Sequence, residues 1–454
     1  KPYDNMAADA AKQMRMGALS RATTKRGHIE ARILGPVDRH IRADFGVIFE
    51  HVQQVVHDLS WHEWLIDTNK ILMDESFRGA VIKHYGYPTL NALMDTVTDV
   101  ASGDVVSSES IERKMNSLRA GVSVAMMGWN LGTALLQPMG LAQSAVRLEY
   151  KGMNHALLQI TKNPVKAINE IYEKSVFMRL RSKTMNREIN EIRNKIGGQG
   201  MFPGLRSGLE DSYFYLIAKM QLVADAPTWI AAYETAQSEN MDEATSIAKA
   251  DQAVIDSQGS GHIKDLAHVQ RGSPIKKLFT NFMSYFQTTF NLTADSWART
   301  NFRSASSIAH LGVDMIMLYT VPILLEEIVR GALIKGECDG GNDWPCMREK
   351  IIRDHIAYPI SGIIFARELN AIIQGWDYEG PAGTRIYNEI GKLTKQIGQK
   401  EADAAFWKSA NKTLGIWKHY PALQVERVVE GFVALEEGDT ENVLAPLFGY
   451  AKNR

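Results

Sequence analysis

The sequence contains few cysteines and no excess charge of either sign. Only Cys338 and Cys346 are present among 454 residues, in the segment GECDGGNDWPC. Their spacing matches neither a CxxC redox pair nor a four-ligand zinc motif, which leaves a loop disulfide and two free thiols as open alternatives. The 51 basic and 52 acidic residues give a net charge of -1. Overall charge therefore provides no attraction to nucleic acid, and any such contact has to be local.

Sequence signatures of catalysis and of metal binding are also missing. His51, His57 and His62 lack the four-residue spacing that places two ligands on one helix face. Asp265 lies between two histidines, but closeness in sequence does not make a triad, and no nucleophile elbow is present. The glycines of SQGSG match no phosphate-binding loop. We therefore expect no enzyme activity and no cofactor or metal in this chain.

Helical periodicity is present almost everywhere. Apolar residues recur every three or four positions, for example across residues 47–59 and 168–178. No run shows the sustained polar and apolar alternation of a strand. A hydrophobic content of 45% with 23% charged residues is typical of a folded protein. We predict an all-α fold, in the form of an elongated multi-helix assembly of two or three subdomains.

Three regions are predicted, because the chain is longer than one hydrophobic core usually supports. They are an N-terminal helical region (1–115), a central helical domain (116–262) and a C-terminal helical domain (263–454). Gly259 and Gly261, in a polar segment between two helical arms, are predicted to form a hinge. The chain begins without an initiator Met, so we expect a processed product or the ordered part of a longer polypeptide.

The first of three apolar segments, AGVSVAMMGWNLGTALLQPMGLAQSAV, covers residues 120–146 and has no ionisable side chain. It is long enough to cross a bilayer, although Asn, Gln and four glycines dilute it. Gly128 and Gly132, on either side of Trp129, have the spacing that lets a second helix approach closely, and Pro138 is expected to kink or end the helix. A buried bundle helix is the leading interpretation, and a segment that enters or lies on a membrane is the alternative.

The second apolar segment, residues 313–334, contains the run MIMLYTVPILL, which is too short by itself to span lipid. The third, residues 356–365, is shorter still. The second segment suits an interfacial helix or a protein contact better than a stable transmembrane span, and a core helix is again the leading interpretation. Its candidate contact residues are Met315, Leu318, Tyr319 and Leu324.

Three stretches carry a family resemblance. They are WNLGTALLQPMGLAQSAVRL, then DSQGSGHIKDLAHVQRGSP followed by LFTNFMSYFQTTFN, and finally YPALQVERVVEGFVALEEGD. Across residues 117–454 the chain resembles the C-terminal region of the large internal virion proteins, or ejection proteins, of short-tailed bacteriophages, which is a polyvalent-protein-associated helical region.

The resemblance implies a non-catalytic role in delivering the phage genome. Such proteins are stored inside the virion, leave through the tail ahead of the genome, and reassemble in the host envelope as a conduit for DNA. The expected partners are further copies of the chain in a ring, other ejection, portal or tail proteins, the genomic DNA and the host membrane. An alternative is a helical scaffold domain of a larger phage polyprotein that carries an enzyme elsewhere, and a third, weaker one is an enzyme with an unrecognised site.

Overall fold

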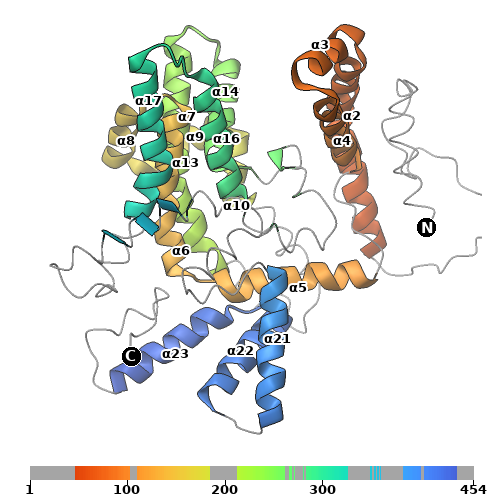
Figure 1. Cartoon of the computed structure of the whole chain (residues 1–454), viewed down its shortest axis with the longest axis vertical. Coiled ribbons are helices and arrows are strands. Elements are labelled where there is room, and N and C mark those ends of the chain that lie inside the picture. Colours follow the sequence, from red (N-terminus) through yellow and green to blue (C-terminus); the bar gives the residue numbers. More distant parts are fainter. Residues whose placement is uncertain are drawn as a thin grey trace, which may run out of the picture. The chain divides into compact units, whose positions relative to one another are not determined.

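The computed structural model describes residues 46–102, 110–184, 212–260, 283–325, 382–399 and 403–436, with a few further residues in 265–280 and 348–358. These residues are 88% helical, with 16 α-helices and no strand (Figure 1). The predicted all-α fold is confirmed. The chain divides into two compact units, Lys1–Arg113 and Lys114–Arg454. The three predicted regions, with boundaries after residues 115 and 262, stay a prediction.

The described part of the first unit is a set of three packed helices. Asp74 caps the second of them by accepting a 2.9 Å hydrogen bond from the backbone N–H of Phe77. His57 donates from Nε2 to the carbonyl of Val100 at 2.9 Å, so this histidine fastens the first helix to the third. The helices are α2 (Gly46–Met73), α3 (Glu75–Tyr85) and α4 (Tyr87–Ser102).

The largest core of the second unit surrounds helix α13 (Tyr215–Ser238), which packs against α14 (Glu243–Gln258). Trp229 is only 2% exposed at the centre of this core, stacked on Tyr233 with 4.9 Å between the ring centroids. Small alanines on both helices allow the close packing. The surrounding helices are α7 (Gly140–Arg147), α8 (Met153–Lys162), α9 (Pro164–Lys174) and α10 (Val176–Thr184).

A second group of helices in this unit, which we name the clasp, joins α5 (Ser110–Met127) to helices near the C-terminus. They are α21 (Ala382–Gln399), α22 (Ala404–Lys418) and α23 (Ala422–Glu436). Val122, Ala125 and Met126 of α5 form a core with Ile416 and Ala422. His419, in the turn between α22 and α23, lies 3.0 Å from the carbonyl of Ser117 through Nε2. The helices of the clasp are therefore joined by a contact between residues about 300 positions apart in sequence.

The apolar segment 120–146, expected to be a helix that Pro138 kinks or ends, is also broken earlier, at Trp129. Helix α5 ends at Met127, and Trp129 takes a left-handed conformation with φ of 55°. The side chain of Asn130 then caps α6 (Leu131–Leu136) by accepting from the N–H of Thr133 at 3.0 Å. A 3-10 turn, η2 (Gln137–Met139), contains Pro138 and leads into α7. The chain turns because Asn130 provides a better start for a new helix than a continuation of the old one.

Helices α16 (Ser284–Arg299) and α17 (Ala305–Met315) form a hairpin and run side by side in Figure 1. Helix α17 begins at Ser304, whose Oγ accepts from the N–H of Ser307 at 3.4 Å. It continues through a π-helical turn, η5 (Ile316–Thr320), and helical backbone extends to Leu325.

Candidate functional site

Among the residues that the structure describes, one helix of 21 residues, Ala305–Leu325, is long and apolar enough to cross a membrane. The apolar run from Met315 is by itself too short to span lipid, but the helix that contains it begins ten residues upstream, at Ala305. Only 28% of its most apolar window is buried. A core helix is covered on most sides, and this helix is less covered than α13, which has twelve buried residues among its 24. We name it helix 305–325.

Helix 305–325 has a buried face and an exposed apolar face. Leu318 is fully buried and contacts Val146 of α7 and Leu292 of α16. Of the other residues predicted from sequence, Met315 and Tyr319 are partly buried around the same cluster, and Leu324 is exposed. The apolar residues exposed along the helix are Ile308, Val313, Ile316, Leu324 and Leu325.

Asp314 is the acidic residue that sequence reasoning passed over. It is 2% exposed and lies near the middle of helix 305–325. Its carboxylate accepts hydrogen bonds from the hydroxyl of Tyr150 at 2.8 Å and from that of Ser296 at 2.7 Å. His310, one turn earlier, lies 3.6 Å away. Burial, together with the hydrogen bond to Asp314, raises the pKa of Tyr150 above its ordinary value, so this phenol stays a donor.

The hairpin carries exposed aromatic side chains at its turn. Trp297 and Phe302 are both exposed, with 4.9 Å between their ring centroids. Arg303 is two residues before the start of helix 305–325. Tryptophan and a basic residue at the end of a span-length apolar helix are typical of a membrane interface, where rings and cations lie at headgroup level.

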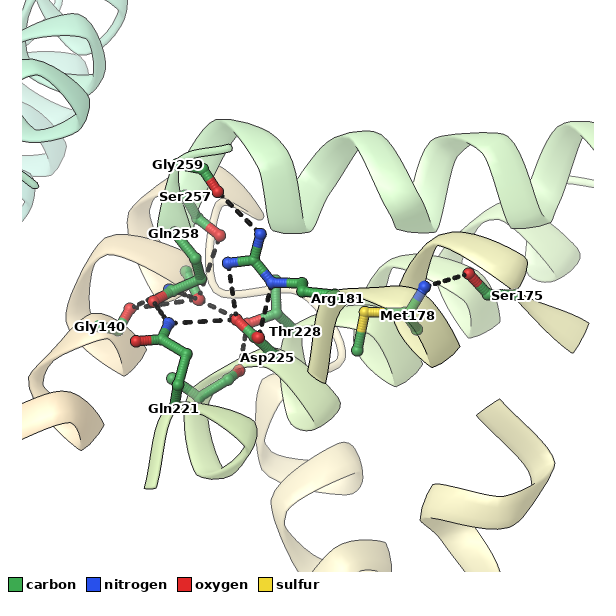
Figure 2. A network of polar contacts seen from close by, with 12 residues as sticks. Gly140, Ser175, Met178, Arg181, Gln221, Asp225, Thr228, Ser257, Gln258 and Gly259 are labelled. Carbon is green, nitrogen blue, oxygen red and sulfur yellow. Dashed lines mark hydrogen bonds and ion pairs between the residues drawn. The ribbon is translucent and has the colours of Figure 1, made fainter. Parts of the chain in front are cut away.

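A buried polar junction joins four helices of the second unit (Figure 2). Arg181 of α10 and Asp225 of α13 form an ion pair with 2.7 Å between Nε and Oδ2, and their side chains are 5% and 3% exposed. Arg181 also donates to the carbonyl of Gly259 at 2.8 Å. Gln258 donates to the carbonyl of Gly140 and to Ser144 Oγ, both at 2.7 Å. The junction thus fixes where α14 ends against α7, α10 and α13.

Gly259, one of the two predicted hinge residues, does end helix α14 and has a φ of 72°. Its role as a hinge stays a prediction, and its carbonyl is held by a buried arginine rather than left free. Gly261, Cys338 and Cys346 lie outside the described residues.

The glycines at which another element approaches the backbone at or near α5 differ in part from those expected. Gly128 lies where an added Cβ would be 2.8 Å from the Cβ of Pro421, so it does meet another element. Gly132 is buried in α6, beyond the helix break, and α6 packs against α13. The second close approach on α5 is made by Gly121, which meets the carbonyl of Ile416. The seven-residue spacing between Gly121, on α5, and Gly128, just past its end, was the available signal.

Trp129 and Pro138 shape the chain between α5 and α7. The indole of Trp129 donates to Ser212 Oγ at 2.9 Å, and its ring meets Tyr213 edge-on at 5.2 Å. These contacts stabilise the left-handed backbone of Trp129, which a bulky residue rarely adopts. Pro138 lies in the 3-10 turn, so the predicted helix end occurs at this position.

A polar groove of about 500 Å³ lies beside the hairpin, between α14 and α16. Its two arginines are engaged with carboxylates. Arg147 pairs with Asp256 at 2.7 Å, and Arg299 pairs with Glu149 at 2.8 Å. Within the part of the chain that the structure describes, no group of three His, Cys, Asp or Glu side chains could hold a metal ion.

Comparisons with protein-family models, with curated proteins and with solved structures gave no match. The resemblance to phage ejection proteins therefore rests on the sequence stretches given above.

Proposed function

We propose that the chain is a structural component of a phage genome-ejection assembly. In this role it is packaged inside the virion and, after ejection, forms part of a DNA conduit through the host envelope. Its partners are further copies in a ring, other ejection, portal or tail proteins, the passing genomic DNA and the host membrane. Two lines support the proposal, namely the sequence resemblance over residues 117–454 and the character of helix 305–325.

The exposed apolar face of helix 305–325 is the single observation that carries the membrane part of the proposal. Lipid removes this face from water at no cost to the backbone, because the hydrogen bonds of a helix are all internal. Trp297, Phe302 and Arg303 at its N-terminal end would lie at the headgroup level of the bilayer. The buried segment 120–146 does not support a membrane role, because protein already covers its side chains along most of its length.

Vesicle co-sedimentation of the 454-residue chain tests this proposal. We expect the protein to pellet with vesicles that contain anionic lipid and to remain in the supernatant without vesicles. Protein that stays wholly in the supernatant with both neutral and anionic vesicles would contradict the membrane role.

Ile316→Asp shows whether helix 305–325 is responsible for binding. Ile316 is 53% exposed near the centre of the helix, where an aspartate disfavours insertion by about 3 kcal/mol, or roughly 100-fold. Ile397→Asp is the matched control, because Ile397 has a similar exposure of 60% on α21. Binding should fall for Ile316→Asp and stay unchanged for Ile397→Asp.

One observation favours the alternative of a helical scaffold within a larger phage polyprotein. Helix α23 exposes an apolar stripe with alternating three- and four-residue spacing, which fits a helical protein partner. The stripe consists of Val425, Val428, Phe432 and Leu435. Sedimentation analysis separates the two functions. A closed ring of identical chains supports the conduit, whereas a monomer that binds only an enzyme from the same polyprotein supports the scaffold.

A further inference from the structure

Asp314 has opposite effects in the two environments that helix 305–325 would occupy. On the protein body, meaning the rest of the second unit, its carboxylate is buried and satisfied by Tyr150 and Ser296. Near the middle of a transmembrane helix, an aspartate disfavours insertion on the order of 100-fold. The same residue therefore stabilises the docked helix and opposes the inserted one.

We infer that Tyr150, Ser296 and Asp314 form a latch that keeps helix 305–325 on the protein body and controls its transfer into the membrane. This inference rests on the proposed membrane function and deepens it by naming the contact that regulates it.

The latch adds a charged contact to the attachment of helix 305–325. The apolar face that docks on the body centres on Leu318. Two further side-chain hydrogen bonds among the described residues hold the helix, between Thr293 and Tyr319 at 2.8 Å and between His355 and Thr320 at 3.2 Å. A hydrogen bond to a charged group contributes more than one between neutral groups, and here it is shielded from water. Two such bonds meet on one carboxylate.

The two hydroxyls of the latch come from different elements, so that it joins three parts of the fold. Ser296 lies on α16, and Tyr150 lies in the turn that follows α7. In that turn Glu149 and Tyr150 both have positive φ, of 50° and 64°, which non-glycine residues rarely adopt. Arg299 of α16 pairs with Glu149 at 2.8 Å and holds the turn against the hairpin. These contacts position the hydroxyl of Tyr150 for its hydrogen bond to Asp314.

A π-helical turn begins two residues after Asp314. Such turns are rare and occur often at functional sites. The latch therefore lies beside an irregular turn near the centre of helix 305–325.

Hydrogen exchange of the 454-residue chain in solution tests the latch without any lipid. Tyr150→Phe and Ser296→Ala each remove one hydroxyl from Asp314, and we expect the amides of residues 305–325 to exchange roughly tenfold faster. Tyr420→Phe is the matched control. It also loses a hydroxyl hydrogen bond, of 2.8 Å to Asn411, but in the clasp. Exchange of residues 305–325 that is equal in Tyr150→Phe and in the unchanged protein would overturn the latch.

Vesicle binding separates failure of the latch from failure of the membrane function. With anionic vesicles, Tyr150→Phe should bind faster, and Asp314→Leu should bind on the order of 100-fold more tightly than the unchanged protein. A second outcome is that the variants exchange faster in solution but no protein binds vesicles. This outcome rejects the proposed membrane function, and with it the control of insertion by the latch. If the unchanged protein and all variants bind vesicles at the same rate, the membrane function is supported and the latch is rejected. Circular dichroism of each variant confirms that it is folded.

Discussion

At the residue scale, burial decides the ionisation of Asp251. Burial raises the pKa of this carboxyl, and the hydrogen bonds from Ser175 and Trp229 lower it by less. Because the folded pKa lies above the ordinary value of 3.8, the folded state binds the proton more tightly. The free energy of unfolding should therefore fall as pH rises through the interval between the two pKa values.

Asp251→Asn removes this titration while its amide oxygen still accepts from Ser175 and Trp229. We expect the variant to equal or exceed the stability of the unchanged protein at pH 7, by up to about 1 kcal/mol. The difference should shrink as pH falls below the ordinary pKa of aspartate. Urea unfolding at several pH values measures this difference in the free energy of unfolding. A larger stability gain of the variant at low pH than at neutral pH would contradict this account.

Arg181 and Asp225 depend on each other because both are buried. Arg181→Met leaves the carboxylate of Asp225 without its cation, and we expect a loss of about 3 to 5 kcal/mol in the free energy of unfolding. Arg181→Met combined with Asp225→Leu should recover much of that loss, because no uncompensated charge remains. Thermal or urea denaturation of the single and double variants provides the comparison. A double variant less stable than Arg181→Met would show that the polar junction itself, rather than charge compensation, sets the stability.

At the scale of elements, the clasp depends on the glycines of α5. A methyl group at position 121 would overlap the backbone carbonyl of Ile416, which cannot rotate away as a side chain can. Gly121→Ala should therefore cost about 1 to 3 kcal/mol of stability. Gly391→Ala is the control on α21, where an added Cβ meets no atom within 4 Å, and it should be neutral or slightly stabilising. Equal effects of the two substitutions on unfolding would show that α5 and α22 are not held at this distance.

The elements could be predicted from sequence better than the contacts between them. Apolar spacing predicted helices correctly because the period is a local property. The break after α5 was missed, since the left-handed backbone of Trp129 is stabilised by Ser212 and Tyr213, more than 80 positions away. Gly121 was missed for the same reason, because its neighbour is Ile416. Asp314 was passed over as well, because its partner Tyr150 lies 164 positions away.

At the scale of the whole second unit, the core around α13 and the core of the clasp differ in size and in the length of chain they close. The core around α13 has thirteen buried members within residues 153–254, whereas the clasp core has five, which span residues 122–422. The contact between Ser117 and His419 closes a loop of 302 residues, which costs more chain entropy than the short loops around α13. The clasp therefore gains less free energy from apolar burial than the core around α13, and its formation costs more chain entropy.

We therefore expect the clasp to open before the core around α13. In native-state hydrogen exchange at rising urea concentrations, amides of α5, α22 and α23 should lose protection first, while those of α13 and α14 persist. Gly121→Ala should lower only the first transition, because it acts between α5 and α22. Simultaneous loss of protection in both groups would show one cooperative unit instead. The proposed passage through a narrow phage tail would benefit from this order, because opening the clasp releases the long-range contact between Ser117 and His419 first.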